Sequence, residues 1–267
     1  MKDFKYVILF SISLCIACQS STKKTGKEKI DKKEIQKEID EIMYPLPSPF
    51  ELTNMLNDIE ASYIIGITNE ADKASTYLTM QNQALNLGIY SSDLAYASTY
   101  NLSGEINLYL TSVKALAKEL GIIGAVDKNL ALKIEESIEN KDKITEVITD
   151  LFYKTYSYLN KNGNTELSYL ILAGTWIEGI YLTTNISENT FDNINIIKII
   201  MKQEESLKKI LELMESYKHN DMLKPVYANL KEIMDVYKIE EGTDALSISQ
   251  LQEITKLVSN YRSEIIN

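Results

Sequence analysis

The chain has 267 residues, of which 45% are hydrophobic and 25% charged, and its 28 basic and 38 acidic side chains give a formal net charge of −10. This composition excludes a disordered tail, a collagen-like repeat and a polytopic membrane protein. The acidic balance disfavours a nucleic-acid partner, because a phosphate backbone is bound by clustered Lys and Arg. One His and two Cys leave little nucleophile, general-base or zinc chemistry. We therefore expect no enzyme activity, no metal and no cofactor.

Residues 1–17 have the pattern of a secretory signal peptide. Lys2 and Lys5 form a charged start, and a largely apolar run of eleven residues, 6–16, ends before the small Ala17. A membrane-spanning helix needs about 20 apolar residues, so this run is too short to span a bilayer. Its length and flanks predict cleavage after Ala17.

The residues around the expected cleavage point resemble a bacterial lipobox, Leu14-Cys15-Ile16-Ala17-Cys18. The usual Leu three positions before the lipidated cysteine is replaced by Cys15, and Leu14 lies one step earlier. The resemblance implies that Cys18 is acylated and anchors the chain in the lipid bilayer of a bacterial cell envelope, facing the periplasm. Either the inner or the outer membrane fits. The alternative is ordinary signal cleavage that leaves Cys18 as a free thiol.

Residues 18–43 form a basic tether in front of an acidic body. Residues 19–34 carry a net charge of +3 and the signal carries +1, so removing both from −10 leaves −14 on residues 35–267. A basic segment beside a lipid anchor could contact anionic headgroups. The alternative is a solvated spacer.

Residues 44–267 are expected to form one all-α domain, either a multi-helix bundle or a helical-hairpin array. Three of the four prolines lie within residues 45–49 and mark its start, and Ser48 to Glu51 has the pattern of a capping box. Ser247 with Gln250 has the same pattern near the end of the chain. Helical periodicity predicts about nine helices, at 49–67, 71–101, 103–120, 127–139, 141–161, 165–186, 190–218, 225–238 and 247–265.

Two of the expected helices look alike. Residues 93–99 align with residues 178–184 at an offset of 85, and each stretch follows a glycine and an aromatic residue. Repeated helix pairs build superhelical interaction folds, so a weak internal duplication is one explanation. Convergence on amphipathic helices rich in Tyr and Thr is the other.

Two acidic residues are the most informative candidates for a site. Glu178 lies in a stretch that is apolar on nearly every side, which predicts a buried helix and therefore a carboxylate that needs partners. Asp93 has Tyr96 and Tyr100 at +3 and +7, and Glu178 has Tyr181 at +3, so tyrosine hydroxyls could donate to the carboxylates. Either these groups fix helix packing, or they line a pocket for a small ligand.

Trp176, Gly174 and Gly179 share the helix of Glu178. Trp176 is expected in the core, with a ligand-stacking platform as the alternative. The glycines suggest a close approach of a second helix, or a bend. His219 lies at an expected helix end and fits a C-terminal cap or a solvent-exposed group.

Three segments together resemble a group of uncharacterised lipoproteins of Bacteroidota-type bacteria, over most of residues 44–265: Tyr44-Pro45-Leu46-Pro47-Ser48-Pro49-Phe50-Glu51-Leu52-Thr53, Leu87-Gly88-Ile89-Tyr90-Ser91-Ser92-Asp93-Leu94-Ala95-Tyr96 and Trp176-Ile177-Glu178-Gly179-Ile180-Tyr181. The resemblance implies a helical, lipid-anchored envelope protein and no activity. We expect a non-enzymatic module that binds or scaffolds an envelope protein. The alternative is a helical domain that binds a small ligand in a pocket near Asp93 and Glu178.

Overall fold

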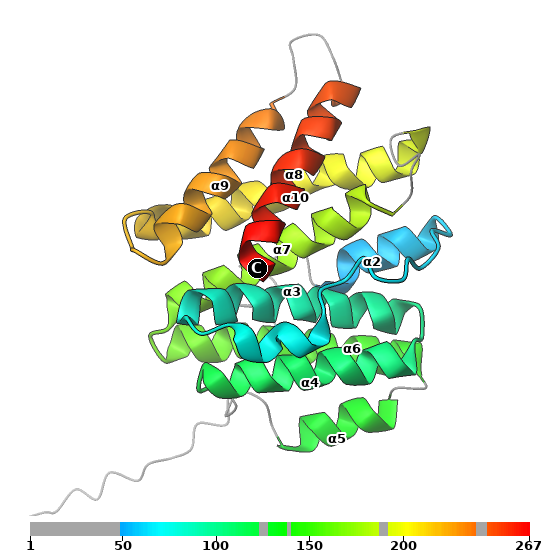
Figure 1. The fold of residues 1–267 in the computed structure, drawn as a ribbon, viewed down its shortest axis with the longest axis vertical. Coiled ribbons are helices and arrows are strands. Elements are labelled where there is room, and N and C mark those ends of the chain that lie inside the picture. The colour runs from blue at the N-terminus through cyan, green and yellow to red at the C-terminus, as the bar shows by residue number, and fades with distance from the viewer. Residues whose placement is uncertain (1–48, 123–127, 138–139, 187–191, 239–244) are drawn as a thin grey trace, which may run out of the picture.

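The computed structural model describes residues 49–122, 128–137, 140–186, 192–238 and 245–267. Within these ranges the chain is an all-α multi-helix bundle and contains no strand, which confirms the expected fold class (Figure 1). The expected signal peptide, Cys18 and the tether lie outside the described residues. No helix in the described ranges has the length and apolar character needed to cross a membrane.

Among the described α-helices, the longest link in sequence is that between α2 and α3, which contains the 3-10 helix η1. Their bounds are α2 (Pro49–Asp58), the 3-10 helix η1 (Ala71–Thr76), α3 (Met80–Thr99), α4 (Ser103–Glu119), α5 (Lys128–Ser137), α6 (Lys141–Lys161), α7 (Thr165–Thr184), α8 (Ile194–Met214), the 3-10 helix η3 (Glu215–Tyr217), α9 (Leu223–Val236) and α10 (Ile248–Ile266).

The centre of the bundle is a crossing of α3 and α7, which are buried on nearly all sides. The two helices run in the same direction, since Leu85 lies against Gly174 and, further along both, Ser92 donates a hydrogen bond to the carbonyl of Thr175. A Cβ on Gly174 would stand 2.0 Å from the carbonyl oxygen of Leu85, and one on Gly88 would stand 2.2 Å from that of Ile171. The expected close helix approach at Gly174 is therefore confirmed, and the glycines let two backbones touch.

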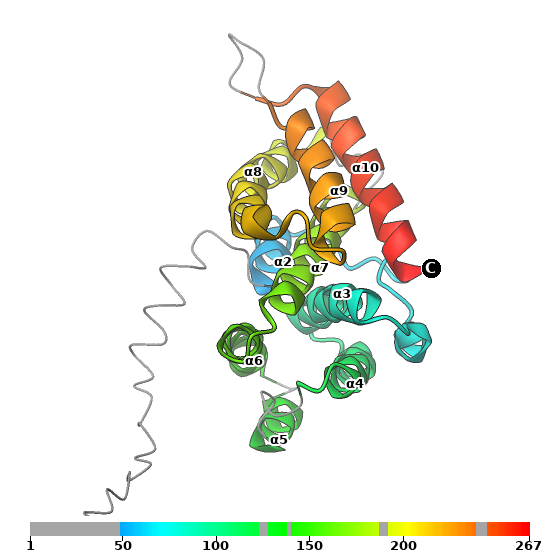
Figure 2. The same cartoon turned by 90° about the vertical axis from the view of Figure 1, so that its left-hand side faces the viewer.

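The other helices pack around this crossing (Figures 1 and 2). Helices α4 and α6 flank α3, and α5 lies outside α6. Helices α8, α9 and α10 cover α7, and α2 contacts both central helices. The second expected close approach is also present, because a Cβ on Gly179 would stand 2.4 Å from the Cδ1 atom of Leu52 in α2. The two helices with the similar sequence pattern, α3 and α7, are the pair that cross at the centre of the bundle.

Several helix ends lie where the sequence predicts them. Asn101, Gly121 and Gly163 adopt positive φ angles directly after α3, α4 and α6. In each case the following amide donates back to a carbonyl five residues earlier, which is the hydrogen bond of a Schellman cap. The predicted capping box at Ser247 and Gln250 is confirmed, with both reciprocal hydrogen bonds.

Three predicted helices were too long. The helix expected at 49–67 ends at Asp58, because Glu60 adopts a φ of 58° and the amide of Ala61 donates to the carbonyl of Leu56. The helix expected at 71–101 is divided into η1 and α3, and α3 begins where the Thr79 side chain accepts from the amide of Asn82. The helix expected at 190–218 is α8 followed by η3.

Candidate functional site

The crossing of α3 and α7 brings Asp93 and Glu178 together in the interior. Both side chains are fully buried, with 0% exposure, and they lie close enough for the charge of Glu178 to raise the pKa of Asp93, after the larger effect of burial itself. Asp93 follows Gly88 in α3, and Glu178 follows Gly174 in α7, each by about one helical turn. Because the two helices run in the same direction and touch at these glycines, their carboxylates also lie near each other. The two predicted site residues therefore form one cluster, and two negative groups meet in a medium that penalises charge.

Arg262 of α10 is the partner of Glu178. Its Nε donates to Oε2 of Glu178 at 2.5 Å and its Nη2 donates to Oε1 at 2.9 Å, which is the bidentate geometry that suits guanidinium and carboxylate. The same Nη2 donates to the carbonyl of Ile67 at 3.3 Å. The ring of Tyr181 lies 3.9 Å from the Arg262 Cζ atom, which adds a cation–π contact. The last helix is thus joined to α7 through a buried ion pair.

Asp93 has a different set of partners. The backbone amide of Asn69 donates to Oδ2 of Asp93 at 3.2 Å. Burial and the neighbouring charge of Glu178 raise the pKa of Asp93 well above its usual range, against the opposing effect of Arg262. Oδ1 of Asp93 and Oδ1 of Asn69 are buried and have no hydrogen-bond partner within the protein. The acid on α3 is therefore incompletely satisfied, whereas the acid on α7 is fully engaged.

The expectation that tyrosines near Asp93 donate to its carboxylate was wrong. The hydroxyl of Tyr100 donates to the carbonyl of Ala61 at 2.6 Å, and that of Tyr96 accepts from the amide of Ile64 at 3.1 Å. These hydroxyls bind the main chain of the α2–α3 connection, because that segment passes over the same face of α3. Tyr181 does not donate to Glu178 either, and its ring instead covers Arg262.

The α2–α3 connection lies antiparallel along α3 in a regular register. Four hydrogen bonds join the connection to α3, and the residue number rises along the connection while it decreases along α3. The pairs are Ala61 with Tyr100, Ile64 with Tyr96, Asn69 with Asp93 and Glu70 with Tyr90. The α3 residues recur at three or four positions, so they form one stripe on the helix. An extended segment without a neighbouring strand leaves its backbone groups unpaired, and this stripe of hydroxyl and carboxyl groups supplies the missing partners.

Two other helices hold the same connection. On α4, Tyr109 hydrogen-bonds to Thr68 and Ser112 donates to the carbonyl of Ala71. At its end, Tyr77 donates to the carbonyl of Ile266 in α10. We refer to residues 61–77 as the pinned segment. In Figure 1 it follows α2, passes through η1 and ends before α3, and it is fixed by side chains of α3, α4 and α10.

The pinned segment presents apolar side chains to solvent. Ile65 is 89% exposed beside Gly66, which forms a turn with a φ of 80°. Leu108, 54% exposed, lies on α4 one residue before Tyr109, which hydrogen-bonds to Thr68 of the segment. Leu78, which follows the segment, is 86% exposed. These positions were not predicted, since an isolated apolar residue in a connection carries no sequence signal of its exposure.

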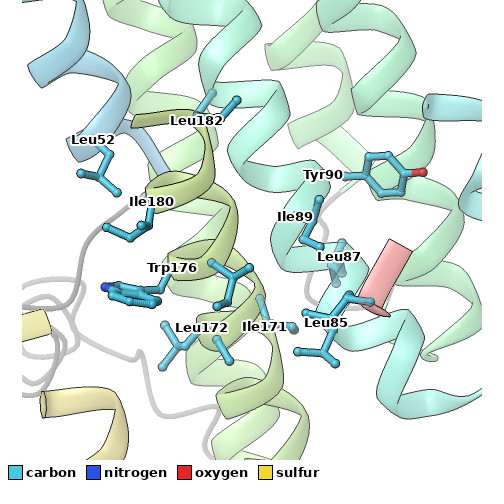
Figure 3. Packing of buried hydrophobic residues seen from close by; sticks show 14 of the residues in the cluster. Leu52, Leu85, Leu87, Ile89, Tyr90, Ile171, Leu172, Trp176, Ile180 and Leu182 are labelled. Carbon is cyan, nitrogen blue, oxygen red and sulfur yellow. The ribbon is translucent and has the colours of Figure 1, made fainter. Parts of the chain in front are cut away.

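Trp176 belongs to the core, as expected. Its side chain is fully buried and, with Leu52 of α2, lies on the side of α7 that faces away from α3 (Figure 3). Its indole Nε1 has no hydrogen-bond partner within the protein. A ring sealed in this way cannot stack on a ligand from solvent, so the platform alternative is not supported. His219 is exposed after η3, as one of the two expected alternatives had it.

Two hollows lie elsewhere in the bundle. A small, largely apolar cavity of about 30 Å³ lies between α3, α4 and α6, and its lining includes Leu94, Val113 and Phe152. An open groove of about 320 Å³ lies between α8 and α9, where Leu211 and Met234 are edged by charged side chains. Neither Asp93 nor Glu178 lines these hollows, so the predicted ligand pocket beside the two acids is not found at either place.

Sequence reasoning missed Arg262, the residue that closes the cluster. A signal was present, since Leu251, Ile254, Val258 and Ile265 mark the buried stripe of α10 and Arg262 falls on it. A cation at a core position predicts a buried anion.

Among the described residues, no group of three or more His, Cys, Asp or Glu side chains is arranged to hold a metal ion. Comparison of the chain with protein-family models, curated proteins and solved structures finds no match.

Proposed function

We propose that this chain is a lipid-anchored protein of a bacterial cell envelope that binds a protein partner through the outward side of the pinned segment. The observation that carries the proposal is the exposure of Ile65, 89%, in a segment whose backbone is held on both sides of it. Isolated apolar side chains on a surface are common. A connection that exposes such a side chain while its backbone is held by several hydrogen bonds resembles the binding loops that rigid scaffolds carry.

A fixed segment favours binding for an energetic reason. Association loses free energy when a loop must be ordered at the interface, and a loop already held by its own domain avoids that loss. The hydroxyls of Tyr90 and Tyr100 donate to the main-chain carbonyls of Glu70 and Ala61. The outward side chains, Ile65 among them, are consequently free to contact a partner.

The geometry gives less support to a catalytic or small-ligand role for the two acids. Both oxygens of Glu178 accept from Arg262, and neither acid is exposed to solvent. A catalytic carboxylate must reach its substrate, and this pair reaches only protein groups. Of the two hollows described above, the groove between α8 and α9 is the more open, and it joins an apolar floor to charged edges.

Site-specific photo-crosslinking in intact cells tests the binding proposal. A photoreactive amino acid at Ser62, an exposed position in the pinned segment, should give a discrete adduct. The substitution Ile65→Glu in the same chain should abolish that adduct. The matched control places the photoreactive group at Ile248, which is 60% exposed at the start of α10. Identical adducts at both positions, or an adduct at Ser62 that survives Ile65→Glu, would contradict the proposal.

The lipid anchor is tested separately. Mass spectrometry of the mature N-terminus should find a diacylated or triacylated Cys18, and the Cys18→Ser variant should leave the membrane fraction. A mature chain that begins at an unmodified Cys18 would reject the anchor and leave the binding surface untouched.

A further inference from the structure

The buried cluster of Asp93, Glu178 and Arg262 contains more acidic than basic groups. Two carboxylates and one guanidinium meet at side chains that are 0%, 0% and 6% exposed. The guanidinium is already engaged with both oxygens of Glu178 and with the carbonyl of Ile67. If both acids were ionised, a net negative charge would be buried without a partner, which is a strongly unfavourable arrangement.

The cluster also lacks a hydrogen-bond donor. Asp93 lies beside Glu178 in the buried cluster, and two ionised carboxylates can only accept hydrogen bonds. Oδ1 of Asp93 has no donor within the protein. One added proton corrects both faults, because it removes the excess charge and gives Asp93 an O–H donor for the neighbouring Glu178.

We propose that Asp93 is a neutral carboxylic acid at pH 7, that it donates its proton to Glu178, and that this shared proton makes the joint between α3, α7, α10 and the pinned segment sensitive to pH. The chemical step is ionisation, in which the proton leaves Asp93 for solvent and a second negative charge remains beside Glu178. The inference is independent of the proposed binding function, because it concerns the interior of the bundle.

The other groups around Asp93 do not supply a substitute charge. Tyr63 and Tyr77 of the pinned segment, Tyr90 of α3 and Tyr109 of α4 act on it electrostatically. Burial raises the pKa of each of these hydroxyls, to about 12 for Tyr63, so they stay neutral through the physiological range. On α7 and α10, Tyr181 and Arg262 are already paired with each other.

The sign of the pH dependence follows from linkage. An acid whose pKa is raised by folding holds its proton in the folded state after the unfolded chain has released it. Its stabilising effect is complete below the ordinary Asp pKa of about 3.9 and is lost as pH rises towards the folded value. Over that interval one retained proton makes the unfolding equilibrium constant rise about tenfold per pH unit. Alkaline conditions should loosen the joint at Asn69 and at Arg262.

Carboxyl ¹³C NMR of the full-length chain, labelled at Asp and held in mild detergent, tests the protonation state directly. One Asp resonance should keep the protonated chemical shift at pH 6.5, and it should be absent from the Asp93→Asn variant. In Glu178→Gln that resonance should titrate at lower pH, because the neighbouring negative charge is gone. Complete titration of all Asp signals below pH 5 in the wild-type protein would overturn the proposal, whether or not either variant folds.

Urea unfolding between pH 5 and pH 9 tests the joint. Asn at position 93 keeps a donor for Glu178 and an acceptor for Asn69 but cannot ionise. The unfolding constant of the wild-type protein, divided by that of Asp93→Asn, should therefore rise with pH. A ratio that does not change with pH, or one that changes with the concentration of Na⁺ or K⁺ instead, would show that no proton is shared.

Discussion

The carbonyl oxygen of Leu85 in α3 lies 2.0 Å from the position where a Cβ on Gly174 of α7 would stand. Both groups belong to helix backbones, so no side chain can move aside to make room. We therefore predict that Gly174→Ala destabilises the protein by about 3 kcal/mol or more, as overpacking against a rigid neighbour does. The free energy of unfolding in urea measures the effect.

A matched control is available in α4. A Cβ on Gly104 would meet no atom within 4 Å, and the residue is helical. Gly104→Ala should consequently leave the stability unchanged or raise it by up to about 1 kcal/mol, because alanine is the better helix former. If Gly104→Ala and Gly174→Ala had equal effects, the close crossing of α3 and α7 would be refuted.

Removal of Arg262 should be among the most damaging single changes. Arg262→Ala leaves the buried carboxylate of Glu178 without its bidentate donor, and we predict a loss of about 3–5 kcal/mol in unfolding free energy. Replacing both partners by leucine should recover much of this loss, since an apolar pair leaves no buried charge. Equilibrium unfolding of Arg262→Leu, Glu178→Leu and the variant that carries both changes measures the coupling energy of the two residues.

The ion pair of Lys256 and Glu253 on the same helix provides the comparison. Both side chains are largely exposed, and Lys256→Ala should cost no more than about 1 kcal/mol. An Arg262→Ala effect as small as that of Lys256→Ala would mean that the Glu178 site is hydrated and not closed.

The hydroxyls of Tyr90 and Tyr100 should stabilise the pinned segment locally. Phenylalanine at either position leaves a main-chain carbonyl, of Glu70 or of Ala61, without its donor and should cost about 1–2 kcal/mol. Hydrogen exchange should accelerate in peptides from the pinned segment more than in α8. Tyr227→Phe is the control, since that hydroxyl binds Glu215 at the surface and its loss should change little.

The cap of α10 is predicted to contribute in the ordinary range. Ser247 accepts from the amide of Gln250 and Gln250 returns the bond, so Ser247→Ala should lower the unfolding free energy by about 1 kcal/mol. Ser247→Asp should retain most of it. A thermal or urea midpoint that is identical in all three proteins would show that the start of α10 is frayed.

The class of the fold was predictable because the helices carry local signals. Gly121 and Gly163 stop helices for a steric reason that depends on no other part of the chain, and Ser247 starts one in the same way. The end of α2 was missed because Glu60 adopts a positive φ without being glycine or asparagine. Such a conformation is imposed by tertiary contacts and leaves no mark in the sequence.

The candidate site was only half predictable. A carboxylate in an apolar helix predicts a buried partner, and this reasoning identified Asp93 and Glu178. It could not identify the partner, because Arg262 follows Glu178 by 84 residues and reaches it only through packing. The tyrosines were assigned to the wrong acceptor for the same reason, since the main chain of residues 61–70 competes for their hydroxyls.

The way the pinned segment is held also has a practical consequence for protein engineering. At residues 61, 64 and 70 its hydrogen bonds with α3 use main-chain amides and carbonyls, and its solvent-facing residues, such as Ser62 and Ile65, do not enter the bonds that fix its path. Foreign recognition sequences could be grafted at these positions while the helices beneath stay unchanged. The domain would then act as a display scaffold with a preset loop conformation.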